Sequence, residues 1–277
     1  MVANMIGTGV FTSLGYQLEA LPSAFPILLL WALGGVLSFC GALCYAELVV
    51  MLPRSGGEYH LLREAYHPLA GFLAGWVSMV AGFAAPIALA AMAFGRYVSK
   101  LGVPVHPLWL AAMAVVLVTA PMLGSTAALG RYLGGLTLLK VGLILACITG
   151  AVLPAHWIGT NNAPSVTLLP KSGDWDLILS GGFATSLIYV MYAYTGWNGA
   201  AYVAGELRNP KRTVPLSLLG GTALVMLLYI GLNAAFLARA PWETLRSEPE
   251  VALAAARAIF GERGGAWMGG LIACGLL

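Results

Sequence analysis

Two apolar segments of this sequence carry glycine in their middle, where a helix tolerates it least. Residues 1–18 contain Gly7 and Gly9, and residues 177–206 contain Thr-Gly-Trp-Asn-Gly at positions 195–199. Each glycine in a helix interior costs about 1 kcal/mol relative to alanine. A helix that breaks there leaves N–H and C=O groups without intrahelical partners, and its two ends carry opposite partial charges. The pattern predicts two broken helices whose main-chain groups can bind a charged small molecule.

The two breaks can hold both charges of a zwitterion. Thr8, Gly9 and Val10 would begin a half-helix whose free N–H groups and positive dipole end favour a carboxylate. The carbonyl groups that end the preceding half-helices, at residues 5–6 and 192–193, would face an ammonium group. A small ligand with both groups is an α-amino acid. Because no acidic or basic residue lies at the breaks, we expect the amino acid to be neutral.

The glycines have a second interpretation, which is close packing. Small residues let membrane helices approach each other, as Gly71 with Gly75 or Gly265 with Gly269 could do. The positions of the two glycine-bearing segments favour broken helices, because the segments lie five spans apart. Secondary transporters often bind substrate at the bilayer midplane, between broken helices at corresponding positions of two inverted repeats. If each repeat contains five spans, an odd number, the second repeat crosses the membrane in the opposite direction. The spacing of the two segments therefore indicates such a transporter.

Lys140 is the one ionisable residue deep inside an apolar segment. It lies about nine residues into residues 132–153, or about 13 Å along the helix axis. A lysine at this depth costs about 2.5–3.5 kcal/mol on insertion scales. We therefore expect Lys140 to face the bundle interior and to have a partner there. Two compatible roles are open, one in coupling and one as a hydrogen-bond donor to a broken-helix carbonyl.

The composition requires that these residues lie in membrane-spanning helices. Of the 277 residues, 60% are hydrophobic and 9% are charged, against about 45–50% and about 25% in soluble domains. A span needs about 20 apolar residues that satisfy their own backbone hydrogen bonds, so we predict an all-α polytopic membrane protein. The predicted apolar segments are residues 1–18, 24–51, 69–98, 107–124, 132–153, 177–206, 214–239 and 264–277.

The connections between these segments predict the orientation. Residues 208–212 hold three basic side chains in a short loop, where the positive-inside rule is most informative, so we expect a cytoplasmic N-terminus. Residues 52–59 combine proline, glycine and mixed charge, which is typical of a tight intracellular linker. Residues 240–263, with four glutamates, are expected to form one long connection.

Other chemistries have little support in the sequence. The four histidines lie singly in loops or at span ends, and the four cysteines lie in apolar segments, so we predict neither a metal site nor a disulfide framework. The spans contain no HExxH or GxSxG motif, and no GxxxxGK[ST] phosphate loop occurs in the sequence. The net charge of +3 is small and scattered. We expect no enzymatic activity, no cofactor and no nucleic-acid partner.

Seven motifs, taken in their order and spacing, resemble those of amino acid permeases of the amino acid–polyamine–organocation superfamily, in particular the L-type amino acid transporter-like branch. They lie at residues 6–11, 45–48, 53–59, 71–76, 139–141, 192–198 and 206–210. The resemblance implies a LeuT-like bundle of two inverted five-helix repeats, with helices 1 and 6 broken. It also implies proton-coupled transport or exchange of amino acids.

The resemblance further implies roles for individual residues. Gly7-Thr8-Gly9 is similar to the family's carboxylate site, and the backbone of Met5 approaches the substrate amine. Tyr192 resembles the aromatic residue that covers the substrate in this family. Asn198 resembles a polar residue that lies beside the pocket. Lys140 resembles a lysine that replaces bound sodium in some relatives, which favours proton coupling or exchange. The implied substrate-binding residues are Met5, Ile6, Gly7, Thr8, Gly9, Val10, Tyr192, Ala193, Tyr194, Thr195, Gly196 and Asn198, with Lys140 for coupling.

Measured against that family, the chain is expected to be a fragment truncated at both ends. Helices 1–7 and the start of helix 8 would be present in a single transporter domain, residues 1–277. The first repeat would cover about residues 1–153, and a partial second repeat about residues 177–277. The expected partners are an amino acid, the bilayer of the plasma membrane, and protons as coupling ion, while an accessory subunit stays unknown. The alternative function is a non-transporting membrane subunit that binds partner helices.

Overall fold

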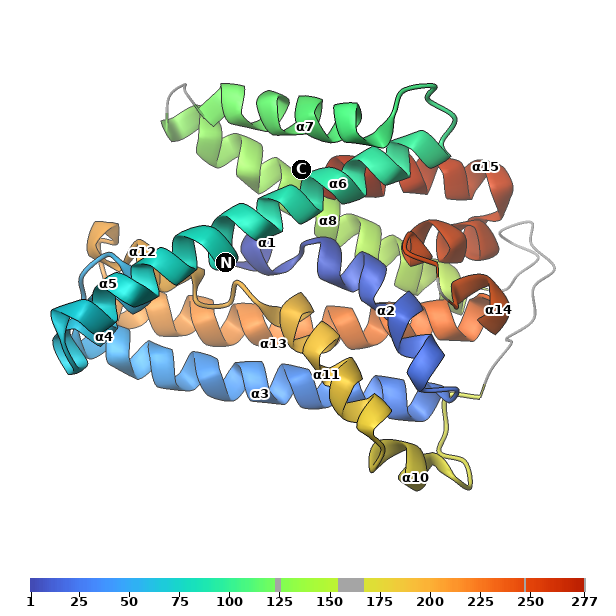
Figure 1. The fold of residues 1–277 in the computed structure, drawn as a ribbon, viewed down its shortest axis with the longest axis horizontal. Coiled ribbons are helices and arrows are strands. Elements are labelled where there is room, and N and C mark those ends of the chain that lie inside the picture. Colours follow the sequence, from blue (N-terminus) through green and yellow to red (C-terminus); the bar gives the residue numbers. More distant parts are fainter. Residues whose placement is uncertain (123–125, 154–166, 247, 277) are drawn as a thin grey trace.

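The computed structural model describes residues 1–122, 126–153, 167–246 and 248–276, and Figure 1 shows how their elements are arranged. Every regular element in this part of the chain is a helix. The prediction of an all-α polytopic membrane protein is confirmed.

Four helical stretches among the described residues are long and apolar enough to cross a membrane. They correspond to predicted segments, and the first has the predicted bounds. They are α3 (Ala24–Met51), the third span at Pro68–Lys100, α8 (Thr126–Val152) and α13 (Pro210–Arg239). The long helices α3 and α13 pack side by side, and both run horizontally in Figure 1.

The third span changes its winding partway along. It begins as α5 (Pro68–Val77), continues as a π-helix, η1 (Ser78–Ala84), and ends as α6 (Ala85–Lys100). The following helix, α7 (Pro107–Met122), packs against α6. At the other end, the expected linker at residues 52–59 leads into a surface helix, α4 (Gly57–Ala65), which packs against α5.

The two glycine-bearing segments are broken where the sequence predicts. The first consists of α1 (Val2–Met5) and α2 (Thr8–Ala20), separated by two residues. The second follows the short helix α10 (Asp174–Ile178) and runs as α11 (Gly181–Tyr194), then loses helical structure. It resumes as α12 (Gly199–Tyr202) and the 3₁₀ helix η2 (Ala204–Glu206). The broken segments lie against each other, because α2 packs on α11.

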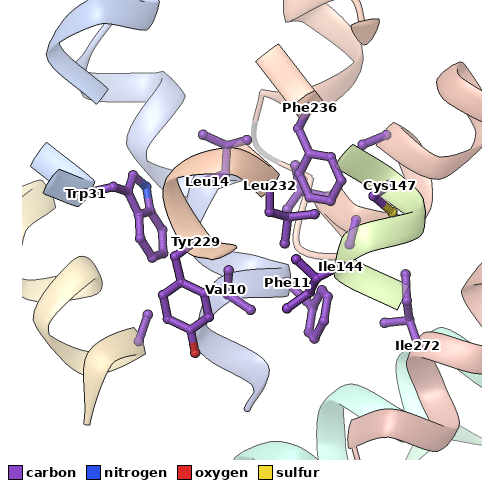
Figure 2. Close-up of a cluster of buried hydrophobic side chains, with 14 of the residues drawn as sticks. Val10, Phe11, Leu14, Trp31, Ile144, Cys147, Tyr229, Leu232, Phe236 and Ile272 are labelled. Atoms are coloured by element: carbon purple, nitrogen blue, oxygen red, sulfur yellow. The ribbon is translucent and has the colours of Figure 1, made fainter. Parts of the chain in front are cut away.

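Helix α2 occupies the middle of the core. Figure 2 shows Val10, Phe11 and Leu14 of α2 among side chains from α8, α13 and α15, with Leu232 and Ile144 close to them. All three α2 side chains are at most 2% exposed. Between helices in a lipid bilayer, side chains such as these are held by close van der Waals packing. The half-helix that opens at Thr8 is therefore held firmly along its length.

The expectation of a long connection at residues 240–263 is wrong. The chain forms a short helix, α14 (Trp242–Leu245), and α15 (Val251–Leu276) begins inside the expected connection, with a bend at Gly261 (φ 74°). The charges in this stretch suggested a loop, but four of them, on Glu248, Glu250, Arg257 and Glu262, form ion pairs. Glu250 is only 2% exposed, and it forms ion pairs with Arg96 at 3.0 Å and Lys100 at 2.7 Å.

We expect Glu250→Ala to lower the free energy of unfolding by about 2 kcal/mol, because hydrogen bonds to charged groups contribute about 1.5–3 kcal/mol. Thermal unfolding in detergent measures this change. The control is Glu262→Ala, since that side chain is 84% exposed and its pair with Arg257 spans 3.6 Å. An exposed pair contributes at most about 1 kcal/mol. Equal losses in the two variants would contradict an anchoring role for Glu250.

Candidate substrate-binding site

The two broken helices open on one cavity of about 200 Å³. This volume is below the range of about 300–1,000 Å³ that is typical of sites for drug-sized ligands, so the cavity suits a smaller molecule. The first break, the end of α11, the third span, α8 and the end of α15 all contribute to its wall. The lining residues are Ala3, Asn4, Met5, Ile6, Gly7, Thr8, Gly9, Pro86, Ile87, Ala90, Lys140, Tyr192, Ala193, Thr195 and Leu276.

Most of the predicted site residues lie on this cavity, and four do not. Val10 is fully buried in the core, and the hydroxyl of Tyr194 donates to the carbonyl of Trp31 at 3.0 Å. Gly196 is not among the lining residues, and its carbonyl accepts the amide of Asn4, while Asn198 donates its amide to Glu58. The predicted residues on the wall are Met5, Ile6, Gly7, Thr8, Gly9, Lys140, Tyr192, Ala193 and Thr195.

Gly7 and Gly9 have different surroundings. A Cβ atom at Gly9 would lie 2.6 Å from Cα of Ala193, so this glycine lets α2 approach α11. A Cβ at Gly7 would meet nothing within 4 Å, and the backbone there is extended (φ −120°). Close packing therefore accounts for Gly9 but not for Gly7, which lines the cavity and has open space where a Cβ would lie.

A side chain that the sequence analysis overlooked joins the two breaks. The amide of Asn4 donates to the carbonyl of Gly196 at 3.0 Å. Gly196 has φ of 95°, and a Cβ there would lie 2.5 Å from the main-chain oxygen of Asn4. The signal was present in the sequence, since Asn4 is the one polar side chain before the first break.

The main-chain acceptors differ in how they are used. The carbonyl of Met5 accepts the hydroxyl of Tyr229 at 2.6 Å and the N–H of Gly7 at 2.9 Å. The carbonyl of Tyr192 accepts both the N–H of Thr195 at 3.1 Å and its hydroxyl at 2.7 Å. A carbonyl oxygen has two lone pairs, so both oxygens are fully used. The expectation that these two carbonyls face a ligand ammonium is therefore not supported.

The donor side of the cavity is the start of α2. Its first turn has no side-chain cap, because the N-cap residue is Gly7. The first N–H groups of a helix have no intrahelical acceptor, and the dipole adds positive charge there. Thr8 and Gly9 both line the cavity, so this end of α2 can receive an anionic group.

Lys140 extends from α8 to the same cavity. The aliphatic part of its side chain lies against Gly275 of α15, because a Cβ at that glycine would lie 3.4 Å from Cγ of Lys140. Among the described residues, no hydrogen bond or ion pair of its ammonium is found, so the expected partner is not observed. Although no acidic or basic residue lies at the breaks themselves, the expectation of a pocket without a charged group is wrong, because Lys140 lies on its wall.

Comparison with known proteins relates the whole chain to a family. The sequence model of the family described as "Amino acid permease" matches residues 1–277. The b(0,+)-type amino acid transporter 1 of Mus musculus is 32% identical over 90% of this chain and 51% of its own length. The Large neutral amino acids transporter small subunit 2 of Rattus norvegicus is 32% identical over 89% of this chain and 47% of its own length.

A third relative, the Asc-type amino acid transporter 1 of Mus musculus, is 30% identical over 89% of this chain and 47% of its own length. The chain thus spans about half the length of the curated relatives that it matches. All three relatives carry the name of a transporter rather than an enzyme. Because the family's sequence model matches the whole chain, this integral membrane protein belongs to the amino acid permease family.

Proposed function

We propose that this chain takes part in secondary transport of neutral L-amino acids by alternating access, as symport or exchange. The observation that carries the proposal is that both broken helices open on one small cavity. The names of three relatives, each an amino acid transporter, agree with it. A LeuT-like arrangement of inverted repeats is part of the proposal, and it is supported by the two breaks lying five spans apart.

In the proposed complex, the two poles of the amino acid bind main-chain groups. The carboxylate accepts hydrogen bonds from the N–H groups of Thr8 and Gly9, which line the cavity at the start of α2. The ammonium binds the carbonyls of Ile6 and Ala193, because those of Met5 and Tyr192 are already occupied. Asn4 holds the two breaks together, so the donors and acceptors keep a fixed separation.

The neutral preference rests on the wall of the cavity and on one relative. No carboxylate lies among the described lining residues, so a cationic side chain has no counter-charge. The name of one relative specifies large neutral amino acids. Within the part of the wall that the structure describes, Lys140 is the one charged residue, and we assign it to coupling rather than to substrate selection. On the basis of the three basic side chains at residues 208–212, we also propose a cytoplasmic N-terminus. The plasma membrane is the location that the family resemblance implies.

Binding to the purified chain tests the substrate class. Leucine at about 100 times its Kd should stabilise the protein by about 2.7 kcal/mol. Competition against labelled leucine by alanine, glutamate and arginine measures selectivity. We expect neutral amino acids to compete best. Stronger competition by glutamate would assign Lys140 to substrate selection and overturn the neutral preference.

Filling the cavity should prevent binding. Gly7→Val places two methyl groups in open space without strain in the extended backbone, so we expect at least tenfold weaker leucine binding, or about 1.4 kcal/mol. Gly220→Val is the matched control, because Gly220 is exposed on α13 and also has nothing within 4 Å of its would-be Cβ. Unchanged affinity in Gly7→Val would place the substrate elsewhere. Gly9 is less informative, because a side chain there collides with Ala193.

Lys140→Ala tests proton coupling. In proteoliposomes, uptake of labelled leucine by the parent protein should increase with an inward proton gradient. The variant should lose this dependence, because Lys140 is the one lysine, arginine, histidine or acidic residue on the described wall of the cavity. Lys171→Ala, on the exposed stretch before α10, serves as control. A pH profile of Lys140→Ala like that of the parent would remove the proton role.

A further inference from the structure

The carboxylate of Glu58, outside the cavity, gathers three hydrogen-bond donors from two elements. The hydroxyl of Tyr45 on α3 donates to Oε1 at 3.2 Å. The amide of Asn198 donates to the same oxygen, and the hydroxyl of Tyr202 donates to Oε2. Glu58 itself lies in the first turn of α4. One side chain thus connects the end of the second span to the stretch that follows the break after α11.

The stretch held by Glu58 has little stability of its own. Helix α12 has four residues and no side-chain cap, whereas isolated helices shorter than about 12–15 residues are marginal. Asn198 precedes α12 and Tyr202 ends it, so the one carboxylate binds both ends of this helix. Ser55 adds a further bond from the same linker, since its Oγ accepts the N–H of Gly205 at 3.1 Å.

Glu58 is itself supported from the third span. Helix α4 lies close on α5, because a Cβ at Gly71 would come within 2.7 Å of the carbonyl oxygen of Tyr59. The ring of Tyr202 packs edge to face on Phe83 of the π-helix, with centroids 5.3 Å apart. The ring also lies over Gly57, where a Cβ would be 2.6 Å from it. The position of Tyr202 is therefore defined on several sides.

The chemistry of these contacts requires an acceptor at Glu58. Among the described residues, no cation forms an ion pair with Glu58, and its three donors are neutral. Hydrogen bonds from neutral donors to a carboxylate are roughly twice as strong as bonds between neutral groups. Without this carboxylate, all three donors would lose their shared acceptor at once, and α12 would lose both of its attachments.

We propose that Glu58 is a positioning residue that holds the second half of the broken segment at residues 195–206. The proposal rests on the proposed function in one respect, namely that this stretch forms part of the substrate site. Thr195 lines the cavity and lies three residues before Asn198. By fixing Asn198, Glu58 limits how far Thr195 can move from the cavity. Asn198 thus serves the site through Glu58 and not by lining the pocket.

Hydrogen–deuterium exchange of the full chain tests the positioning role directly. In Glu58→Ala we expect exchange at residues 195–206 to be at least tenfold faster, with α3 and α13 unchanged. Glu58→Gln should fall between this variant and the parent, because its neutral amide oxygen can still accept hydrogen bonds, although weaker ones, and its NH₂ group can donate to the hydroxyl of Tyr202. Glu64→Ala is the matched control, since Glu64 is an exposed acid on the same helix. Parent-like exchange at residues 195–206 in Glu58→Ala would overturn the proposal.

If Glu58→Ala exchanges fast throughout the chain, Tyr202→Phe provides a second test of the same proposal. It removes one donor and should also raise exchange at residues 195–206, whereas Tyr59→Phe, on the exposed side of α4, should not. No change in Tyr202→Phe would overturn the proposal. Leucine affinity is measured in parallel, and we expect a fall of about tenfold in Glu58→Ala. If the parent binds no leucine, the proposed function fails, while the exchange data still decide the role of Glu58.

Discussion

A helix that is interrupted inside a bilayer must find partners for the main-chain groups that it releases, because lipid offers none. In this protein the partners come from nearby turns and from distant helices. Tyr229 donates a hydrogen bond to the carbonyl of Met5, Thr195 donates to that of Tyr192, and Asn4 donates to that of Gly196. These bonds fix the course of both breaks before any ligand is present. The remaining main-chain groups at the breaks are then the ones that can serve a substrate.

The long spans were predictable because composition and length determine them locally. Helix α3 has the predicted bounds, and the breaks fall at the glycines, where the helix is intrinsically weak. Residues 240–263 were mispredicted because charge in a sequence window suggests solvent. Glu250 pairs with Arg96, 154 residues away, and with Lys100 on the same helix, and no local pattern indicates that such a charge will be neutralised.

The site was predictable to the level of segments but not of atoms. The glycine pattern identifies which helices open, because the energetic reason for the break is local. The pattern cannot identify which carbonyls remain free to bind a ligand. The hydroxyl that donates to the carbonyl of Met5, for example, lies 224 residues further along the chain. The same holds for Asn198, whose amide is directed to Glu58, 140 residues earlier. Lys140 was found because a lysine in an apolar segment is conspicuous without any tertiary information.

The π-helix of the third span determines which of its residues face the cavity. A stretch bonded from i to i+5 winds more slowly than an α-helix, so it turns every later residue about the helix axis. Pro86, Ile87 and Ala90 follow this stretch directly and form part of the cavity wall. Uniform α-helical winding would present another side of α6 in their place. The seven residues of the π-helix, which lie outside the pocket, thus determine which side of α6 forms one of its walls.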